Sequence, residues 1–412
     1  MTTPTSPADP ERQPTAGPGP GRRRLTELLR RDTVGGLLML LAAVAALLWA
    51  NLGSASYEAV STFVIGPMDV AHWASSGVLT IFFFLAGLEL KHEFTEGSLA
   101  EPRKALVPIA AAVGGMIVPA FIYLAINGIH PAGDHRGWAV PMATDIAFVM
   151  AILAIVGRGL PRSLRAFLLT LAIVDDLGAI LVIAIAFTAD LSPAWLLAAL
   201  ACFVLWWLLQ YRRRGAWYVY LPLGVLAWWC LHASGVHATI AGVVLGLLTR
   251  ARRDPGEAAA PLQRWQHLWQ PISSGLAVPI FALFAAGVTL EPELLGRLFS
   301  DPVALGIAAG FLLGKPIGVT LTAWLTTKLT SASLDPSLAW RHVLAAGLLA
   351  GVGFTVAIFV TELAFGGGPE QDIAKTAVLL TSACAAVLGG GLMALLGRRG
   401  TTAAAGATPE TR

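Results

Sequence analysis

Residues 169–187 read LTLAIVDDLGAILVIAIAF, an apolar run long enough to cross a membrane, with two adjacent aspartates near its middle. A helix needs about 20 apolar residues to span the hydrocarbon core. A charge at that depth costs on the order of a few kcal/mol, so ionisable residues within a span are candidates for a functional site. The stretch therefore predicts a membrane helix with a site at Asp175 and Asp176.

The composition of the whole chain supports a membrane protein. Of the 412 residues, 56% are hydrophobic and 13% are charged, whereas soluble proteins carry about 25% charged residues. This excludes a soluble fold and also disorder over most of the chain. The net charge of +3 is small and the basic residues fall between the apolar runs, which excludes a nucleic-acid partner. Three cysteines lie within apolar runs and form no disulfide framework or metal motif: Cys202, Cys230 and Cys384.

Twelve apolar runs predict an all-α polytopic protein with twelve transmembrane helices. They centre near Leu41, Phe84, Gly115, Phe148, Leu177, Cys202, Val225, Val244, Ile280, Gly314, Phe354 and Val387. With the N-terminus inside, 24 of the 28 Lys and Arg residues fall in cytoplasmic segments and three in external ones, as the positive-inside rule requires. The predicted domains are a disordered, amphipathic cytoplasmic tail over 1–32, the twelve-helix domain over 33–397 and a cytoplasmic tail over 398–412.

The aspartate pair has the chemistry of a cation or proton site. Two carboxylates this close cannot readily both ionise, and their oxygens suit small hard cations. Small neighbours such as Gly178 leave room beside them. The alternative is a polar contact between helices. Lys315 lies within the apolar run FLLGKPIGV (311–319), where a buried ammonium needs one of the deep acids as its counter-charge. The alternative is that its aliphatic side chain reaches to the membrane interface and places the ammonium there.

Two spans carry helix-breaking residues. The stretch GWAVPMATDIAFVMAIL (137–153) has an internal proline, after which Thr144 and Asp145 would begin a second half-helix as an N-cap pair. The stretch AAGLLAGVGFTVAIF (345–359) is interrupted by glycines. These are the fourth and eleventh spans. Spans three to five start inside and spans ten to twelve start outside, so the two groups of three have opposite orientations. This arrangement predicts inverted-topology repeats. At a crossing of broken helices, Asp145 would offset the positive helix ends and Lys315 the negative ones.

Two further acids, Glu89 and Glu362, lie nearer the ends of spans. A carboxylate at such a position can reach water. Glu362 is therefore interpreted as structural.

Six ordered segments resemble the NhaA-type sodium/proton antiporters. They are FFFLAGLELKHEF (82–94), AVPMATDIAF (139–148), LAIVDDLGAI (171–180), GVHATIAG (235–242), LGKPIGV (313–319) and GVGFTVAIF (351–359). They run across most of the membrane part. The resemblance implies inverted-topology repeats with broken helices, as in this family.

The resemblance implies roles for five residues. Asp175 and Asp176 look like the ion- and proton-binding pair. Thr144 and Asp145 look like the charge-compensating residues at the helix crossing. Lys315 looks like the lysine that pairs with Asp175.

The resemblance also implies a pH response and an assembly. Glu89 and His237 match positions linked to pH response, although a histidine in such a place is more often simply hydrogen-bonded. His92 and Gln270 depart from residues common in the family, which puts the pH range of activation in doubt. The external loop 52–73 matches the place where family members form a homodimer contact, but its sequence does not predict a strand pairing.

The implied function is secondary active transport. Sodium or lithium leaves the cell and protons enter in an electrogenic exchange, for pH and sodium homeostasis across the lipid of a bacterial cytoplasmic (inner) membrane. No cofactor and no enzymatic activity are implied. One alternative is a sodium-coupled symporter of an organic anion on the same fold. A remote alternative is an intramembrane aspartyl protease, which requires paired aspartate motifs on separate spans that this chain lacks.

Overall fold

The computed structural model describes residues 32–157, 159–188, 191–213, 217–253, 257–290 and 292–405. Almost all of the predicted tail 1–32, and the end of the chain from residue 406, lie outside these ranges. In chain order the helices are α2 (Asp32–Leu52), α3 (Ser54–Ser61), α4 (Val70–His72), α5 (Leu79–Thr95), α6 (Pro102–Ile129), α7 (Ile146–Val156), α8 (Arg162–Ala186), α9 (Pro193–Tyr211), α10 (Trp217–Ala233), α11 (Thr239–Leu248), α12 (Pro261–Ile272), α13 (Val278–Ala285), α14 (Pro292–Arg297), α15 (Pro302–Ala309), α16 (Lys315–Leu329), α17 (Trp340–Ala350), α18 (Phe354–Phe365) and α19 (Pro369–Ala405). Short 3-10 or π-helical segments are η1 (Trp73–Val78), η2 (Ser98–Ala100), η3 (His135–Met142), η4 (Ser273–Ala277) and η5 (Gly310–Gly314).

The described helices make this a multi-pass membrane protein. Nine helical segments in these ranges are long and apolar enough to cross a membrane, and the pair α17 and α18, bent by 48°, makes a tenth. Three of the nine run through π-helical turns, which join α4 to α5, α12 to α13 and α15 to α16. Helices α10 and α11 are apolar but shorter, with 17 and 10 residues. Helix α19 continues past the predicted domain boundary at residue 397.

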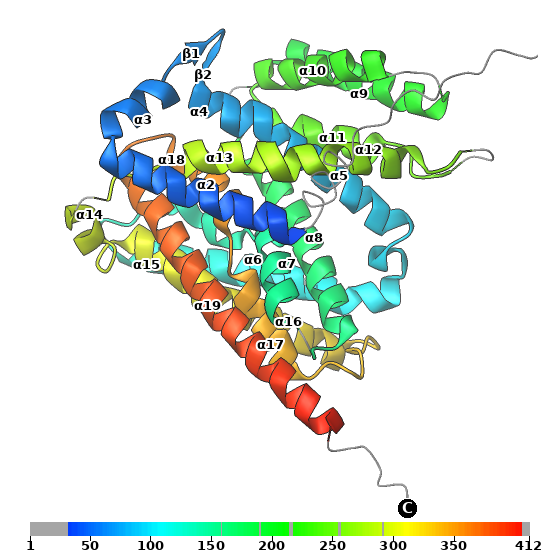
Figure 1. Ribbon diagram of the computed structural model, residues 1–412, viewed down its shortest axis with the longest axis vertical. Coiled ribbons are helices and arrows are strands. Elements are labelled where there is room, and N and C mark those ends of the chain that lie inside the picture. Colours follow the sequence, from blue (N-terminus) through cyan, green and yellow to red (C-terminus); the bar gives the residue numbers. More distant parts are fainter. Residues whose placement is uncertain are drawn as a thin grey trace, which may run out of the picture.

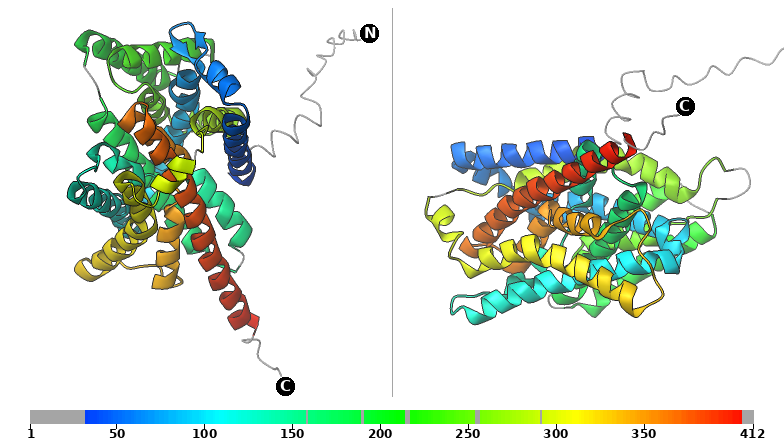
Figure 2. Two further views of the ribbon diagram at one scale, coloured as in Figure 1. Left: turned by 90° about the vertical axis from the view of Figure 1, so that its left-hand side faces the viewer. Right: turned by 90° about the horizontal axis from the view of Figure 1, so that it is seen from below.

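The helices lie roughly side by side, as the right-hand view of Figure 2 shows. Helix α6 packs along α16, α5 along α11, and α13 along α2. Helices α9 and α10 lie together at one end of the molecule, away from α19 (Figure 1). The buried apolar side chains form one large cluster around α6, α8, α16, α17 and α18, and a smaller aromatic one around α5, α9, α10 and α11. The large cluster surrounds the aspartate pair.

The contact between α6 and α16 depends on glycines. A Cβ on Gly318 would lie 2.2 Å from the carbonyl oxygen of Gly114, and a Cβ on Gly114 would lie 2.2 Å from Cγ2 of Thr322. Small residues let membrane helices approach backbone to backbone. This close approach fixes α16, which begins at Lys315, against the centre of the bundle.

A short β-hairpin interrupts the helical chain between α3 and α4. Strands β1 (Val64–Ile65) and β2 (Met68–Asp69) are antiparallel and pair Val64 with Asp69. Gly66 at the turn has a φ of +67°, a conformation that glycine adopts without strain. The hairpin lies in the loop 52–73, for which the sequence predicted no strand.

Candidate functional site at the crossing of two broken helices

Two spans are broken, and their breaks touch. The chain between η3 and α7 is extended at Ala143 and Asp145, while residues 351–353 separate α17 from α18. The backbone N–H of Asp145 donates to the carbonyl oxygen of Val352 at 2.7 Å. The fourth and eleventh predicted spans are thus broken where the sequence placed the breaks, and the two breaks contact each other.

The carboxylate of Asp145 caps two helices. Its Oδ1 accepts from the backbone N–H of Phe148 at 3.0 Å, so Asp145 is the N-cap of α7 as predicted. Its Oδ2 accepts from the hydroxyl of Thr355 at 2.6 Å and from the Thr355 backbone N–H at 3.2 Å, in the first turn of α18. Helix N-termini carry partial positive charge. One buried carboxylate therefore compensates two positive helix ends.

Lys315 also lies at the crossing, fully buried at the start of α16. Its ammonium donates to Asp175 Oδ2, to the carbonyl oxygen of Met142 at the end of η3, and, at 2.7 Å, to Thr144 Oγ1. The Thr144 hydroxyl also lies 2.9 Å from the carbonyl oxygen of Ala350, the last residue of α17. The lysine thus binds an aspartate while it faces the carbonyl ends of the broken helices.

The aspartate pair lies on α8, and the two residues differ in their surroundings. Asp175 is fully buried and paired with Lys315, and its Oδ2 also accepts from the Thr144 hydroxyl. Asp176 is 7% exposed. Among the residues that the structure describes, neither Asp175 Oδ1 nor Asp176 Oδ1 has a hydrogen-bond partner. Buried polar oxygens are normally satisfied, so both are free to bind a proton or a cation.

A charge balance singles out Asp176. The helix N-termini compensate Asp145, and Lys315 compensates Asp175. In the described part of the chain no cation forms an ion pair with Asp176. A buried, ionised carboxylate without a partner is very costly, so Asp176 requires a neutralising ligand from solution.

At Gly178 the structure does not leave the room that the sequence suggested. A Cβ on Gly178 would lie 2.2 Å from Sδ of Met116, so the side chain of Met116 fills the space at this glycine. The glycine serves the packing of α8 against α6. Of the pair, Asp176 keeps 7% of its surface exposed, whereas Asp175 is fully buried.

The two candidate pH-response residues lie away from this cluster. Glu89 is half-buried on α5, and its negative charge acts on Asp176 through space. His237 precedes α11, with its ring 6.4 Å from that of Phe359. Burial lowers the pKa of the His237 imidazole, so this side chain stays neutral at and above neutral pH.

Two residues at the crossing were missed from the sequence. Thr355 binds Asp145 through its hydroxyl and its backbone, and Ser382 of α19 accepts from the backbone N–H of Phe354 at 3.2 Å. The available signal was a hydroxyl residue two positions after the last glycine of the second broken span. Ser382 carries no such signal, because its role depends on the packing of α19.

Broken helices that cross at buried charges within a polytopic bundle define an ion-coupled membrane transporter. The sequence profile of the family described as "Na+/H+ antiporter 1" matches residues 26–393. A Na+/H+ antiporter NhaA of Cutibacterium acnes is 51% identical over 378 residues, 91% of this chain and 89% of the relative. An NhaA of Streptomyces avermitilis is 50% identical over 91% of this chain and 82% of the relative. An NhaA 2 of Rhodococcus jostii is 48% identical over 94% of this chain and 95% of the relative. The chain belongs to the NhaA family of antiporters, which are transporters and not enzymes.

The Lys315 pair makes a prediction about stability. Lys315→Ala should lower the free energy of unfolding by roughly 3–5 kcal/mol, because Asp175 is left charged and buried without a partner. The melting temperature in detergent should fall accordingly. Adding Asp175→Asn should recover part of the loss, whereas additive losses in the double variant would show that the two residues do not act as a pair.

Proposed function

We propose that this protein exports sodium, and also lithium, in exchange for protons across a bacterial cytoplasmic membrane. The observation that carries the proposal is Asp176, a buried carboxylate beside the Asp175–Lys315 pair for which the described residues provide no counter-ion. Carboxylate oxygens bind small hard cations and protons at the same atoms. Exchange of one for the other is the chemistry that such a group supports.

The residues at the crossing have different roles in the transport cycle. In the cytoplasm-facing state, the deprotonated pair binds sodium through the oxygens of Asp175 and Asp176, and Lys315 turns toward the Met142 carbonyl and Thr144. The bundle then rocks around the crossing, where Asp145 holds both half-helix ends. On the outside, protons displace the ion. The pair, or Asp176 together with Lys315, carries two protons against one sodium, which makes the exchange electrogenic.

The topology that we propose has twelve spans and cytoplasmic termini. The nine long segments, the bent pair and the shorter helices α10 and α11 together account for twelve. The excess of Lys and Arg in alternate loops supports the orientation. The breaks in the fourth and eleventh spans support an inverted repeat, in which two triplets of opposite orientation face each other.

We further propose a homodimer through the hairpin of the loop 52–73. Val64 is 65% exposed and Ile65 is 52% exposed, so the strand carries apolar side chains outward. An exposed, apolar strand edge is a template for pairing with another strand. A second copy of the same hairpin would satisfy that edge.

Sodium-driven proton movement by the purified protein tests the function. Proteoliposomes with an imposed proton gradient should lose it on addition of sodium chloride, as reported by a pH-sensitive dye. The double variant Asp175→Asn/Asp176→Asn serves as the control. Sodium uptake that requires an organic anion and leaves the proton gradient intact would favour the symporter instead, and no sodium movement in either condition would contradict both.

A further inference from the structure

A second polar feature lies apart from the crossing. A cavity of 620 Å³ opens between the segment around α4, the turn before α11 and the last turns of α18. Its lining includes Asp69, His72, Ser76, His237, Phe359 and Glu362. In the topology proposed above, it opens on the extracytoplasmic face. No residue of the aspartate pair lines it.

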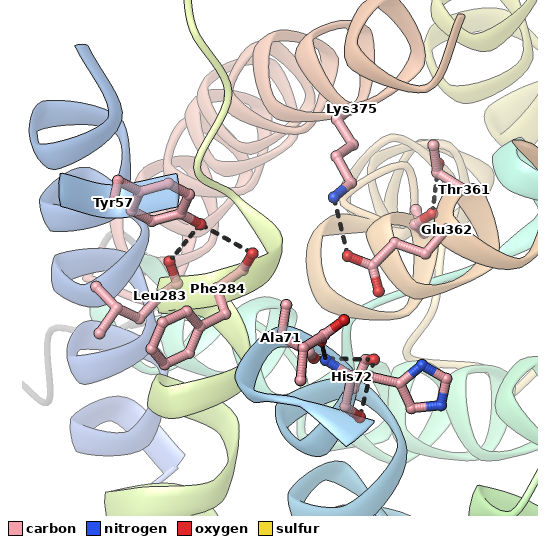
Figure 3. Close-up of polar contacts among 11 residues, drawn as sticks. Tyr57, Ala71, His72, Leu283, Phe284, Thr361, Glu362 and Lys375 are labelled. Atoms are coloured by element: carbon pink, nitrogen blue, oxygen red, sulfur yellow. Dashed lines mark hydrogen bonds and ion pairs between the residues drawn. The ribbon is translucent and has the colours of Figure 1, made fainter. Parts of the chain in front are cut away.

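Glu362 gives this cavity a fixed charge. Its Oε1 binds the ammonium of Lys375 at 2.9 Å, and Figure 3 shows the pair reaching from α18 to α19. The Lys375 side chain is 8% exposed and the Glu362 side chain 22%. Glu362 lines the cavity and Lys375 does not. The cavity therefore meets the negative end of the pair, with the positive end behind it. The sequence had led us to interpret this glutamate as merely structural.

The field of Glu362 extends past its lysine. Burial first, and then the negative charge of Glu362, raise the pKa of Tyr57 to about 12. Tyr57 is on α3, where its hydroxyl lies 2.9 Å from the carbonyl oxygen of Phe284 (Figure 3). The charge of Glu362 therefore acts on Tyr57 as well as on Lys375.

An aromatic layer separates the cavity from the crossing. Phe359 lines the cavity and is 2% exposed, and its ring lies 5.6 Å from that of Phe83 and 6.3 Å from that of Phe281. It follows Thr355, the partner of Asp145, by one helical turn on α18. Glu362 lies seven residues beyond Thr355, about 10 Å along the helix axis. One helix therefore connects the cavity, the aromatic layer and the crossing.

We propose that this cavity is an antechamber that binds sodium on its outward side of the aromatic layer, and that Glu362 sets its affinity for the cation. The inference rests on the proposed exchange of sodium for protons, for which the antechamber is the outer waiting site. Clefts with charge of one sign and low-dielectric walls concentrate counter-ions. Lys375 binds Oε1 of this carboxylate and so holds Glu362 at the wall of the cavity.

The test compares the two faces of the membrane. Glu362→Gln leaves Lys375 as an unpaired positive charge behind the cavity. Its apparent KM for sodium should rise roughly three- to tenfold at the outer face, measured in right-side-out vesicles. The KM at the cytoplasmic face, measured in inside-out vesicles, should not change. The double variant Glu362→Gln/Lys375→Gln removes both charges and should return the outer KM most of the way to the wild-type value.

Glu370→Gln is the matched control, because Glu370 is an exposed acid on the same side of the bundle that does not line the cavity. It should leave both KM values unchanged. The difference between Glu362→Gln and wild type should also shrink as choline chloride is raised, since salt screens charges near water. An equal change of KM at both faces, an unchanged outer KM, or a difference that salt does not reduce would overturn the antechamber. Absence of sodium-driven exchange in the wild-type protein would instead contradict the proposed function itself.

Discussion

Asp176→Asn should abolish sodium-driven proton movement and leave the protein folded. An asparagine amide cannot release and take up a proton in this range, and it offers a cation one neutral oxygen in place of a charged pair. Because Asp176 forms no ion pair within the described structure, its replacement leaves no other charge uncompensated. The exchange rate in proteoliposomes should therefore fall to that of protein-free liposomes.

The neighbouring residue provides the matched control for this variant. Asp175→Asn removes the partner of Lys315 and leaves a fully buried ammonium unpaired, so this variant should melt at a lower temperature. Asp176→Asn should melt at or above the wild-type temperature, because an amide is cheaper to bury than an unpaired carboxylate. Two adjacent, chemically identical substitutions should thus differ in stability while both impair exchange. Wild-type rates in Asp176→Asn would remove Asp176 from the ion site.

The charged residues of the site were predictable because their cost makes them conspicuous. Asp145, Asp175, Asp176 and Lys315 stand within apolar runs, where an ionisable side chain has a strong reason to exist. The break before α7 was equally visible, since a proline followed by a threonine and an aspartate is a local signal for a new helix start. These features depend on residues near one another in the chain.

The partners of these residues were less predictable, because they come from far away in the sequence. Asp145 and Thr355 are separated by 210 positions, and Lys315 and Met142 by 173. Residue patterns alone showed only that Lys315 needs an acid; the choice of Asp175 came from the family resemblance. The role of Gly178 was misjudged for the same reason, since the side chain that fills its space comes from α6.

Span lengths were also harder to predict than span positions. All twelve predicted centres fall in apolar segments, yet α10 and α11 are only 17 and 10 residues long. Hydropathy averages over a window and does not show where a helix ends. The hairpin between α3 and α4 was missed because two residue pairs of antiparallel strand leave no alternation to detect.

The sodium affinity should depend steeply on pH, because protons and sodium need the same oxygens of Asp175 and Asp176. Below the apparent pKa of the pair, each bound proton must leave before sodium binds. The apparent affinity should then weaken about tenfold per pH unit if one proton is displaced, and about a hundredfold if two are. Above that pKa it should level off. Calorimetric titration of the purified protein with sodium from about pH 5 to about pH 9 measures this slope.

The aspartate pair suffices for this pH dependence of the sodium affinity. Glu89→Gln and His237→Ala should therefore shift the pH range in which the affinity changes only modestly or not at all. His237 is informative here because the direction of its pKa shift on folding is known. Burial lowers its pKa in the folded protein, so the unfolded chain binds this proton more readily, and folded stability falls as the pH drops through the ordinary range of histidine. Above neutral pH the imidazole is uncharged in both states and adds nothing to the slope. A sodium affinity independent of pH would contradict a shared site, and a slope that survives replacement of both aspartates would move the ion site elsewhere in the molecule.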